Sequence, residues 1–254
     1  MSAIATYPSL QGKTVVITGG GSGIGESIVT HFARQGCKVG FLDIAEEPSL
    51  ALEKTLTDEG LEVKFIHCDL TDIPATVAGI DTIRQAFGPI AVLVNNAAHD
   101  QRHALEDITP EYFDERIAVN LKHQVFASQA VVDDMKGLGG GAIICMGSTS
   151  WMLGQGGMAC YTAAKSGVLG LMRSLARDLG PYNIRVNSVA PGWIMTERQK
   201  TLWLTPEAEE DLLKRQCLKR HLVPDDIARA VLFFCSDEAG ACTNQSYIVD
   251  GGWY

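Results

Sequence analysis

Long apolar runs and an excess of positive charge are both missing from this 254-residue chain. Lysine and arginine number 21 against 30 aspartate and glutamate residues, which gives a formal net charge of -9. This balance disfavours nucleic acid or an anionic membrane surface as the main partner. The chain also lacks a membrane-spanning stretch and the basic-then-apolar layout of a secretion signal. We therefore expect a cytoplasmic protein with no nucleic-acid partner and no membrane partner.

Signatures of disulfides and metal sites are lacking as well. The seven cysteines are scattered without a Cys-x-x-Cys pair, which suits a reducing cytosol better than a disulfide framework. Several lie in apolar runs, where cysteine acts as a small hydrophobe. His99 and His103, with Asp100 between them, have a spacing that metal ligands can use, but a third ligand is not evident. We expect a loop or hydrogen-bonding role for these histidines, and no metal.

The composition does not shift along the chain as it would at a linker. Hydrophobic residues make up 46% of the sequence, enough for one large core, and repeats or glycine/serine tracts are absent. We predict a single domain over residues 1–254, in which residues near 193–220 form a lid.

Glycine is concentrated where the first strand meets the first helix. Residues 13–18 read as a buried strand, 19–25 as a glycine-rich turn and 26–35 as an amphipathic helix. A dinucleotide loop requires this order, because glycine lets the backbone approach a pyrophosphate and the helix N-terminus supplies amide hydrogens. A merely flexible loop is the alternative interpretation.

An acidic residue ends the second expected strand, over 38–42. Asp43 lies 18 residues after Gly25, where a carboxylate can accept hydrogen bonds from an adenosine ribose and repel a 2′-phosphate. The glycine turn contains no arginine or lysine that could pair with that phosphate. Asp43 therefore favours NAD over NADP, although it could instead cap the following helix.

Strand-like and helix-like segments alternate to the C-terminus. Further strands are expected at 63–67, 90–94, 142–146, 184–189 and 246–249, and further helices at 46–59, 71–87, 109–135, from 161 onward, 206–216 and 224–235. Continuous apolar character predicts a parallel sheet covered on both faces. Ligands bind beyond the carboxyl ends of such strands, and these ends carry Thr18, Asp43, Asp69, Asn96, Ser148 and Pro191.

Three residues between 148 and 165 can form one proton-handling unit. Tyr161 and Lys165 are four residues apart, which places them on one helical face. A nearby ammonium favours the phenolate, so we expect Lys165 to lower the pKa of Tyr161 from about 10. Ser148 can hold the substrate oxygen whose proton Tyr161 takes or gives. A turn serine and an ordinary helix pair are the alternative.

These motifs, together with Asn95-Asn96-Ala97, Asn120 and Pro191-Gly192, resemble those of the short-chain dehydrogenase/reductase family over nearly the whole chain. The resemblance implies an α/β fold: a single-domain, Rossmann-type doubly wound sheet of seven parallel strands flanked by helices. It also implies hydride transfer between a nicotinamide and a carbonyl or alcohol carbon. Tyr161 would be the acid–base, Ser148 would orient the substrate, Lys165 would hold the nicotinamide ribose, and Asn120 would anchor a water in a proton relay.

The family resemblance also implies a set of residues that bind the cofactor, NAD. They are Gly19, Ser22, Gly23, Ile24, Gly25, Asp43, Ile44, Asp69, Leu70, Asn96, Ala97, Ala98, Tyr161, Lys165, Pro191, Gly192, Ile194 and Thr196. Ala98 departs from the glycine that the family often has there, and its methyl group could narrow the space beside the nicotinamide.

The substrate loops are similar to those of bacterial NAD-dependent aldose 1-dehydrogenases, the D-xylose dehydrogenase type in particular. The segments that carry this likeness are His99–His103, Asp114–Ile117, Ser150-Trp151, Thr196–Gln199, Gln216–Lys219 and Asp250–Trp253. They imply oxidation of a small sugar at its anomeric carbon to a lactone. Besides Ser148 and Tyr161, the expected substrate-binding residues are Asp100, Arg102, Trp151, Gln155, Trp193 and Gln199. The tryptophans could instead pack the lid, and Arg102 or Arg198 could be solvated surface charges.

Two other functions remain open from the sequence. Arg102 or Arg198 in the pocket would favour a sugar acid oxidised at a secondary alcohol, since a guanidinium suits a carboxylate. A non-catalytic NAD-sensing protein is disfavoured, because Asn120, Ser148, Tyr161 and Lys165 are all present. The Tyr161 helix is apolar over most of its circumference, which suggests that its outer side is buried too. Members of the family usually form tetramers through this helix and the one carrying Asn120, so the resemblance implies a homotetramer.

Overall fold

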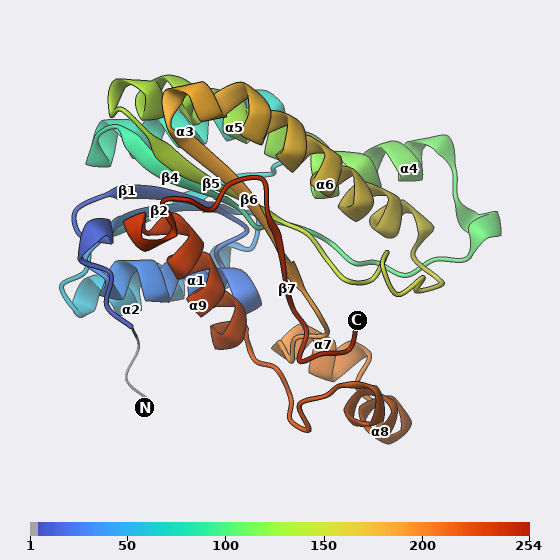
Figure 1. The fold of residues 1–254 in the computed structure, drawn as a ribbon. Helices are drawn as coiled ribbons and strands as arrows, with labels where there is room; N and C mark the ends of the chain where they lie inside the picture. Colours follow the sequence, from blue (N-terminus) through green and yellow to red (C-terminus); the bar gives the residue numbers. More distant parts are fainter. Residues whose placement is uncertain (1–4) are drawn as a thin grey trace.

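The structure is a computed structural model that describes residues 5–254. The expectation that the N-terminus lacks a secretion signal falls partly on residues 1–4, which lie outside the described residues. Across the described residues, seven strands form one parallel sheet in the order β3-β2-β1-β4-β5-β6-β7 (Figure 1). The strands are β1 Thr14–Thr18, β2 Lys38–Asp43, β3 Val63–His67, β4 Ile90–Asn95, β5 Gly141–Met146, β6 Ile184–Pro191 and β7 Ser246–Val249. The strand order changes direction between β1 and β4, where a doubly wound sheet opens a crevice for ligands.

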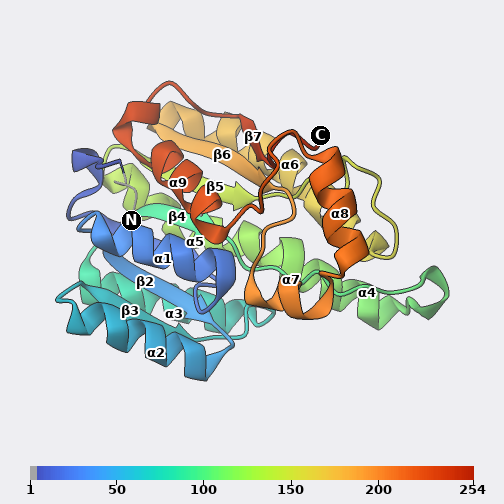
Figure 2. The same cartoon turned by 90° about the horizontal axis from the view of Figure 1, so that it is seen from below.

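Helices cover both faces of this sheet, as Figures 1 and 2 show. Helices α1, α2 and α9 lie on one face, and α3, α5 and α6 lie on the other. The helices are α1 Gly23–Arg34, α2 Glu46–Asp58, α3 Ile73–Phe87, α4 Pro110–Ile117, α5 His123–Gly137, α6 Ala159–Leu179, α7 Glu197–Leu202, α8 Pro206–Arg215 and α9 Pro224–Cys235. The predicted α/β class with seven parallel strands is therefore confirmed.

Each face of the sheet buries its own apolar core. Phe32 of α1 and Phe41 of β2 pack in the first cluster, and Leu93 of β4 and Met172 of α6 pack in the second. The buried thiols of Cys37, Cys145 and Cys235 act as small hydrophobes, since burial raises the pKa of each to about 12. Within the described part of the chain, no helix is long and apolar enough to cross a membrane.

The single helix expected over 109–135 is interrupted. It starts as expected, because Thr109 Oγ1 accepts from the Tyr112 amide at 3.2 Å, but α4 ends at Ile117. A π-helical segment, Ala118–Lys122, joins it to α5. The Nδ2 of Asn120 within this segment donates to the Arg116 carbonyl at 2.9 Å, which an α-helical amide would otherwise bond. Such π-helical insertions are frequently found at functional sites.

Candidate active site

A cavity of about 2160 Å³ opens along the carboxyl ends of the strands. The structure brings nearly all of the predicted cofactor and substrate residues to its wall. They are Gly19, Ser22, Gly23, Ile24, Gly25, Asp43, Ile44, Asp69, Leu70, Asn96, Ala97, Ala98, Asp100, Arg102, Ser148, Gln155, Tyr161, Lys165, Pro191, Gly192, Trp193, Ile194, Thr196 and Gln199.

Two predicted site residues lie away from this wall. Trp151 is half-buried in the turn after β5 and does not line the cavity, so the expected contact between Trp151 and the substrate is not supported. Asn120 is fully buried, and its amide bonds the backbone of His99: Oδ1 accepts from N at 2.8 Å and Nδ2 donates to O at 3.2 Å. The water-anchoring role of Asn120 stays a prediction.

The glycine turn after β1 is packed too closely for side chains. A Cβ on Gly25 would lie 1.8 Å from the Gly19 carbonyl oxygen, and one on Gly19 would lie 2.7 Å from Ala97 Cα. The Ser22 side chain makes no cap hydrogen bond to any described residue, so the first amides of α1 remain available. A glycine-rich turn that leads into a helix N-terminus with free amides can bind a pyrophosphate.

Asp43 ends β2 beside the glycine turn. Its Oδ2 accepts from the Gly21 amide at 2.8 Å, and its Oδ1 accepts from the Ala45 amide at 2.8 Å. The amide of Ala45 belongs to the residue before α2, and α2 has no side-chain cap hydrogen bond, so the alternative of a helix-capping Asp43 is not what the structure shows. The carboxylate also lines the cavity. Ile44 is 63% exposed, and Asp69 accepts from the Thr71 amide at 2.9 Å.

Ser148, Tyr161 and Lys165 meet at the cavity wall between β5 and α6. The Lys165 side chain is almost fully buried. Its Nζ donates to the Met146 carbonyl oxygen at 2.8 Å and lies 5.7 Å from the centroid of the Tyr161 ring. Ser148 Oγ lies 2.9 Å from Ser150 Oγ and also accepts from the Ser150 amide, which holds the hydroxyl in place.

The pKa of Tyr161 shifts in the direction opposite to our expectation. Burial raises the pKa of Tyr161 above 10, and the Ser148 hydroxyl offsets only part of that rise. Burial also lowers the pKa of Lys165 to about 8. The net shift of the Tyr161 pKa is thus opposite to the expected lowering, because desolvation of the phenol is the largest cause and the Asp100 carboxylate adds to it.

The lowered pKa of Lys165 predicts a pH-dependent stability. Below pH 8 the lysine is protonated in both the folded and the unfolded state, so burial imposes its full cost. Between pH 8 and 10.5 the unfolded state binds more protons, and this cost is relieved. The free energy of unfolding of the wild type relative to Lys165→Met should therefore rise through that window, by up to about 3 kcal/mol. Urea titrations at several pH values measure it, and a flat or falling difference contradicts the shift.

Three predicted substrate contacts bond one another in this structure. Gln199 of α7 accepts from Trp193 Nε1 at 2.8 Å and donates through Nε2 to Asp100 Oδ2 at 2.6 Å. Arg198 Nε donates to the other oxygen of Asp100 at 3.3 Å. This network ties the segment after β6 to the loop after β4 and closes one side of the cavity.

Arg102 lies outside this network. Its guanidinium carbon is 4.5 Å from the centroid of the Trp203 ring, a cation–π contact between the loop after β4 and the end of α7. Gln155 lines the cavity as an exposed side chain.

The loop after β4 also uses residues that the sequence interpretation left out of the site. His103 Nε2 accepts from the Cys160 amide at 3.3 Å and so caps α6, whose own N-cap residue is Met158. The buried Arg116 donates to His99 Nδ1 at 2.6 Å. Both histidines thus have the expected hydrogen-bonding role, and among residues 5–254 no group of three metal-ligating side chains is assembled. The sequence did offer one signal for Arg116: it lies four residues before Asn120, which places the two side chains on one helical face.

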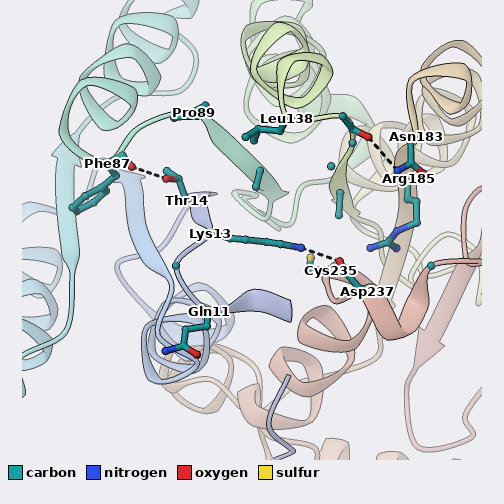
Figure 3. A pocket seen from close by; sticks show the side chains of 17 residues that line it. Gln11, Lys13, Thr14, Phe87, Pro89, Leu138, Asn183, Arg185, Cys235 and Asp237 are labelled. Carbon is teal, nitrogen blue, oxygen red and sulfur yellow. Dashed lines mark hydrogen bonds and ion pairs between the residues drawn. The ribbon is translucent and has the colours of Figure 1, made fainter. Parts of the chain in front are cut away.

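A second cavity, of about 620 Å³, lies at the amino ends of the strands (Figure 3). Its charged side chains already have partners. Lys13 Nζ lies 2.9 Å from Asp237 Oδ1, and Arg185 donates to the carbonyl oxygens of Phe234 and Ser236 at 2.6 and 3.0 Å. Parallel sheets bind ligands at the opposite edge, so the carboxyl-end cavity is the candidate active site.

The fold and the site are those of a dinucleotide-dependent oxidoreductase. A sequence-family profile described as enoyl-(acyl carrier protein) reductase matches residues 19–254. The D-xylose 1-dehydrogenase of Caulobacter vibrioides is 50% identical over 249 residues, 98% of each chain. A Rhizobium meliloti protein named "Probable galactose dehydrogenase" is 48% identical over 97% of this chain and 96% of its own.

The same class appears among solved structures. A 7α-hydroxysteroid dehydrogenase in complex with NADH and 7-oxo glycochenodeoxycholic acid is 33% identical, with a TM-score of 0.92 over 97% of this chain and 96% of that one. The chain belongs to the short-chain dehydrogenase/reductase family. Family membership and the NADH complex together support a nicotinamide cofactor.

Proposed function

We propose that the protein oxidises a small neutral aldose, a pentose or a 6-deoxyhexose, at C1 to its lactone with NAD. The observation that carries this proposal is the meeting of Ser148 and Tyr161 in a cavity whose outer wall offers hydroxyl-bonding groups, Gln155 and Gln199. The similarity to a D-xylose 1-dehydrogenase and to a protein named for galactose oxidation supports it.

The proposed chemistry assigns one task to each residue. Ser148 holds the C1 hydroxyl, and Tyr161 takes its proton while the C–H bond at C1 breaks. Lys165, fixed by the Met146 carbonyl, bonds the nicotinamide ribose and presents a positive charge that favours the phenolate. A nicotinamide held beside C1 would supply the acceptor for the hydride. The sugar thus loses two hydrogens and becomes the lactone, with NADH and a proton as the other products.

A neutral substrate is favoured by the ion pair of one of the two nearby arginines. Arg198 is paired with Asp100, so its charge is already balanced. Arg102 stacks on Trp203 while it lines the cavity. The ion pair of Arg198 weakens the alternative of a sugar acid held by that guanidinium. Since the relatives are named as dehydrogenases, a non-catalytic NAD sensor is not favoured either.

NADH formation from a panel of aldoses and sugar acids tests this function. D-xylose, L-arabinose, L-fucose, D-glucose and D-galactose form the neutral set, and several keto-deoxy sugar acids form the acidic set. We expect turnover of at least one aldose with a lactone as product. Turnover of the acids alone contradicts the proposal.

The preference for NAD rests on Asp43. Asp43→Asn keeps the shape of the side chain, loses one of the two hydrogen bonds that the carboxylate accepts from the Gly21 and Ala45 amides, and removes the negative charge that would repel a 2′-phosphate. We expect the ratio of kcat/KM with NADP to kcat/KM with NAD to rise about tenfold or more, the loss of roughly one charged interaction. Asp58→Asn, on the exposed end of α2, is the matched control. An unchanged ratio in Asp43→Asn contradicts the assignment.

We further propose that the chain is one domain in which residues 193–220 form a lid over the active-site cavity. Helices α7 and α8 lie beyond the carboxyl ends of the strands, outside the layers that cover the sheet (Figure 2). We expect NAD and sugar together to slow amide exchange in α7, and unchanged exchange contradicts a lid.

We also propose that the protein is a homotetramer. Val125 of α5, the helix that follows Asn120, is an exposed apolar residue that a subunit interface would cover. Light scattering that shows a monomer at micromolar concentration contradicts the tetramer.

A further inference from the structure

The backbone of His99 is held firmly at the wall of the active-site cavity. His99 follows the end of β4 by a few residues and lines the cavity. Its amide and its carbonyl both bond the side chain of Asn120, at 2.8 and 3.2 Å. Asn120 is fully buried, so moving His99 would leave buried polar atoms without partners. The position of the imidazole is therefore preset.

Arg116 determines which nitrogen of the His99 ring carries the proton. Arg116 Nη1 lies 2.6 Å from His99 Nδ1. A guanidinium can only donate hydrogen bonds, so Nδ1 must accept and the proton must be on Nε2. Arg116 is itself buried and is braced by Glu115 and by the Tyr112 ring, whose centroid lies 5.4 Å away. The tautomer is thus set by a group that has little freedom to move.

The same surroundings keep His99 neutral. Burial lowers the pKa of His99, and the charges of Arg198 and Arg116 lower it further, against smaller opposing effects of Asp100 and Glu115. A second proton would also place an N–H group against the Arg116 guanidinium. The neutral form of His99, with its proton on Nε2, is therefore favoured.

Among residues 5–254 the His99 ring is bonded at Nδ1 alone, so its Nε2–H has no hydrogen-bond partner there; the ring is half-buried and lines the cavity. Ser148 and Tyr161 line the same cavity, and all three side chains come from segments that follow parallel strands. A neutral N–H donor of this kind suits a sugar hydroxyl oxygen, whereas a carboxylate would be better matched by a cation.

Building on the proposed function, we infer that His99 is a specificity-determining residue that donates its Nε2–H to one non-reacting hydroxyl of the aldose. Arg116 acts through His99 as a positioning residue, since it fixes the donor nitrogen that faces the sugar. Substrate recognition then depends on a hydroxyl oxygen at one position of the ring, besides the C1 oxygen that Ser148 and Tyr161 handle.

The test compares the wild type with His99→Phe and His99→Gln, using D-xylose and its 2-deoxy, 3-deoxy and 4-deoxy analogues. His99→Phe should lower kcat/KM for D-xylose about tenfold or more, with the KM for NAD unchanged. His99→Gln should recover part of the loss, because its amide still offers an N–H donor. One deoxy analogue should be turned over equally well by the wild type and by His99→Phe, since the hydroxyl that pairs with the histidine is already gone.

Each outcome decides the matter. Equal losses with D-xylose and every analogue, or a loss confined to the affinity for NAD, would show a structural role and overturn the inference. A folded His99→Phe with wild-type kcat/KM would overturn it as well. If His99→Phe does not fold, His99→Leu, which also lacks an N–H donor, carries the same comparison with the analogues. Absence of aldose turnover by the wild type removes the proposed function and this inference with it, whereas turnover that is indifferent to residue 99 removes the inference alone.

Discussion

Tyr161→Phe should lower kcat by about 10²–10⁴-fold while NAD still binds with nearly wild-type affinity. The substitution removes one oxygen at the cavity wall, and that oxygen is the acid–base in the proposed reaction. The ring remains to fill the same space, so the packing of α6 is kept. Steady-state NADH formation gives kcat, and calorimetric titration gives the affinity for NAD.

The matched control for Tyr161→Phe is Tyr182→Phe. Tyr182 is about half exposed and packs beneath the Lys136 ammonium, away from the cavity. This variant should retain wild-type kcat. A kcat for Tyr161→Phe within about tenfold of the wild type would mean that another group handles the proton.

Gly25→Ala should weaken NAD binding by about 10- to 100-fold. The new methyl group would lie 1.8 Å from the Gly19 carbonyl oxygen, so the backbone of the glycine turn must move apart. Asn96 Nδ2, which bonds that same oxygen at 2.7 Å, would lose its geometry too. Calorimetric titration with NAD measures the loss, and thermal unfolding shows how much of it is general destabilisation.

Gly137→Ala is the control for that experiment. Gly137 ends α5 in open space, with nothing within 4 Å of an added Cβ, so alanine there should leave NAD binding unchanged. If a folded Gly25→Ala binds NAD as well as Gly137→Ala does, the turn at the end of β1 is not the pyrophosphate cradle.

Local sequence signals were sufficient to predict most of the fold. Strands β3 and β7 and helix α9 occupy the predicted residues, because short apolar runs and the proline at position 224 mark their limits. The interruption between α4 and α5 was missed. Its π-helical segment is stabilised by the side chain of Asn120 bonding a backbone carbonyl, which no glycine or proline in the sequence announces.

The candidate site was predictable where strand ends determine it and less so elsewhere. The glycine turn, Asp43, Ser148 and Tyr161 line one cavity because the carboxyl ends of parallel strands share an edge. The position of Trp151 depends on a turn rather than a strand, and the expected substrate contact there is not supported.

Interactions between distant segments explain the remaining differences. The pKa of Tyr161 rises because surrounding elements bury the phenol, a quantity that the four-residue spacing to Lys165 does not contain. The tautomer of His99 depends on Arg116, seventeen residues away and on another element. A sequence can mark such residues as candidates, but their protonation is decided only by packing.

The most direct test of aldose oxidation at C1 uses D-xylose, or whichever aldose is turned over best, carrying deuterium at C1. We expect the deuterium to be recovered in the reduced cofactor, one mass unit heavier than NADH, together with the unlabelled lactone. Unlabelled NADH formed from the labelled sugar would place the oxidation at another carbon and contradict the proposed reaction.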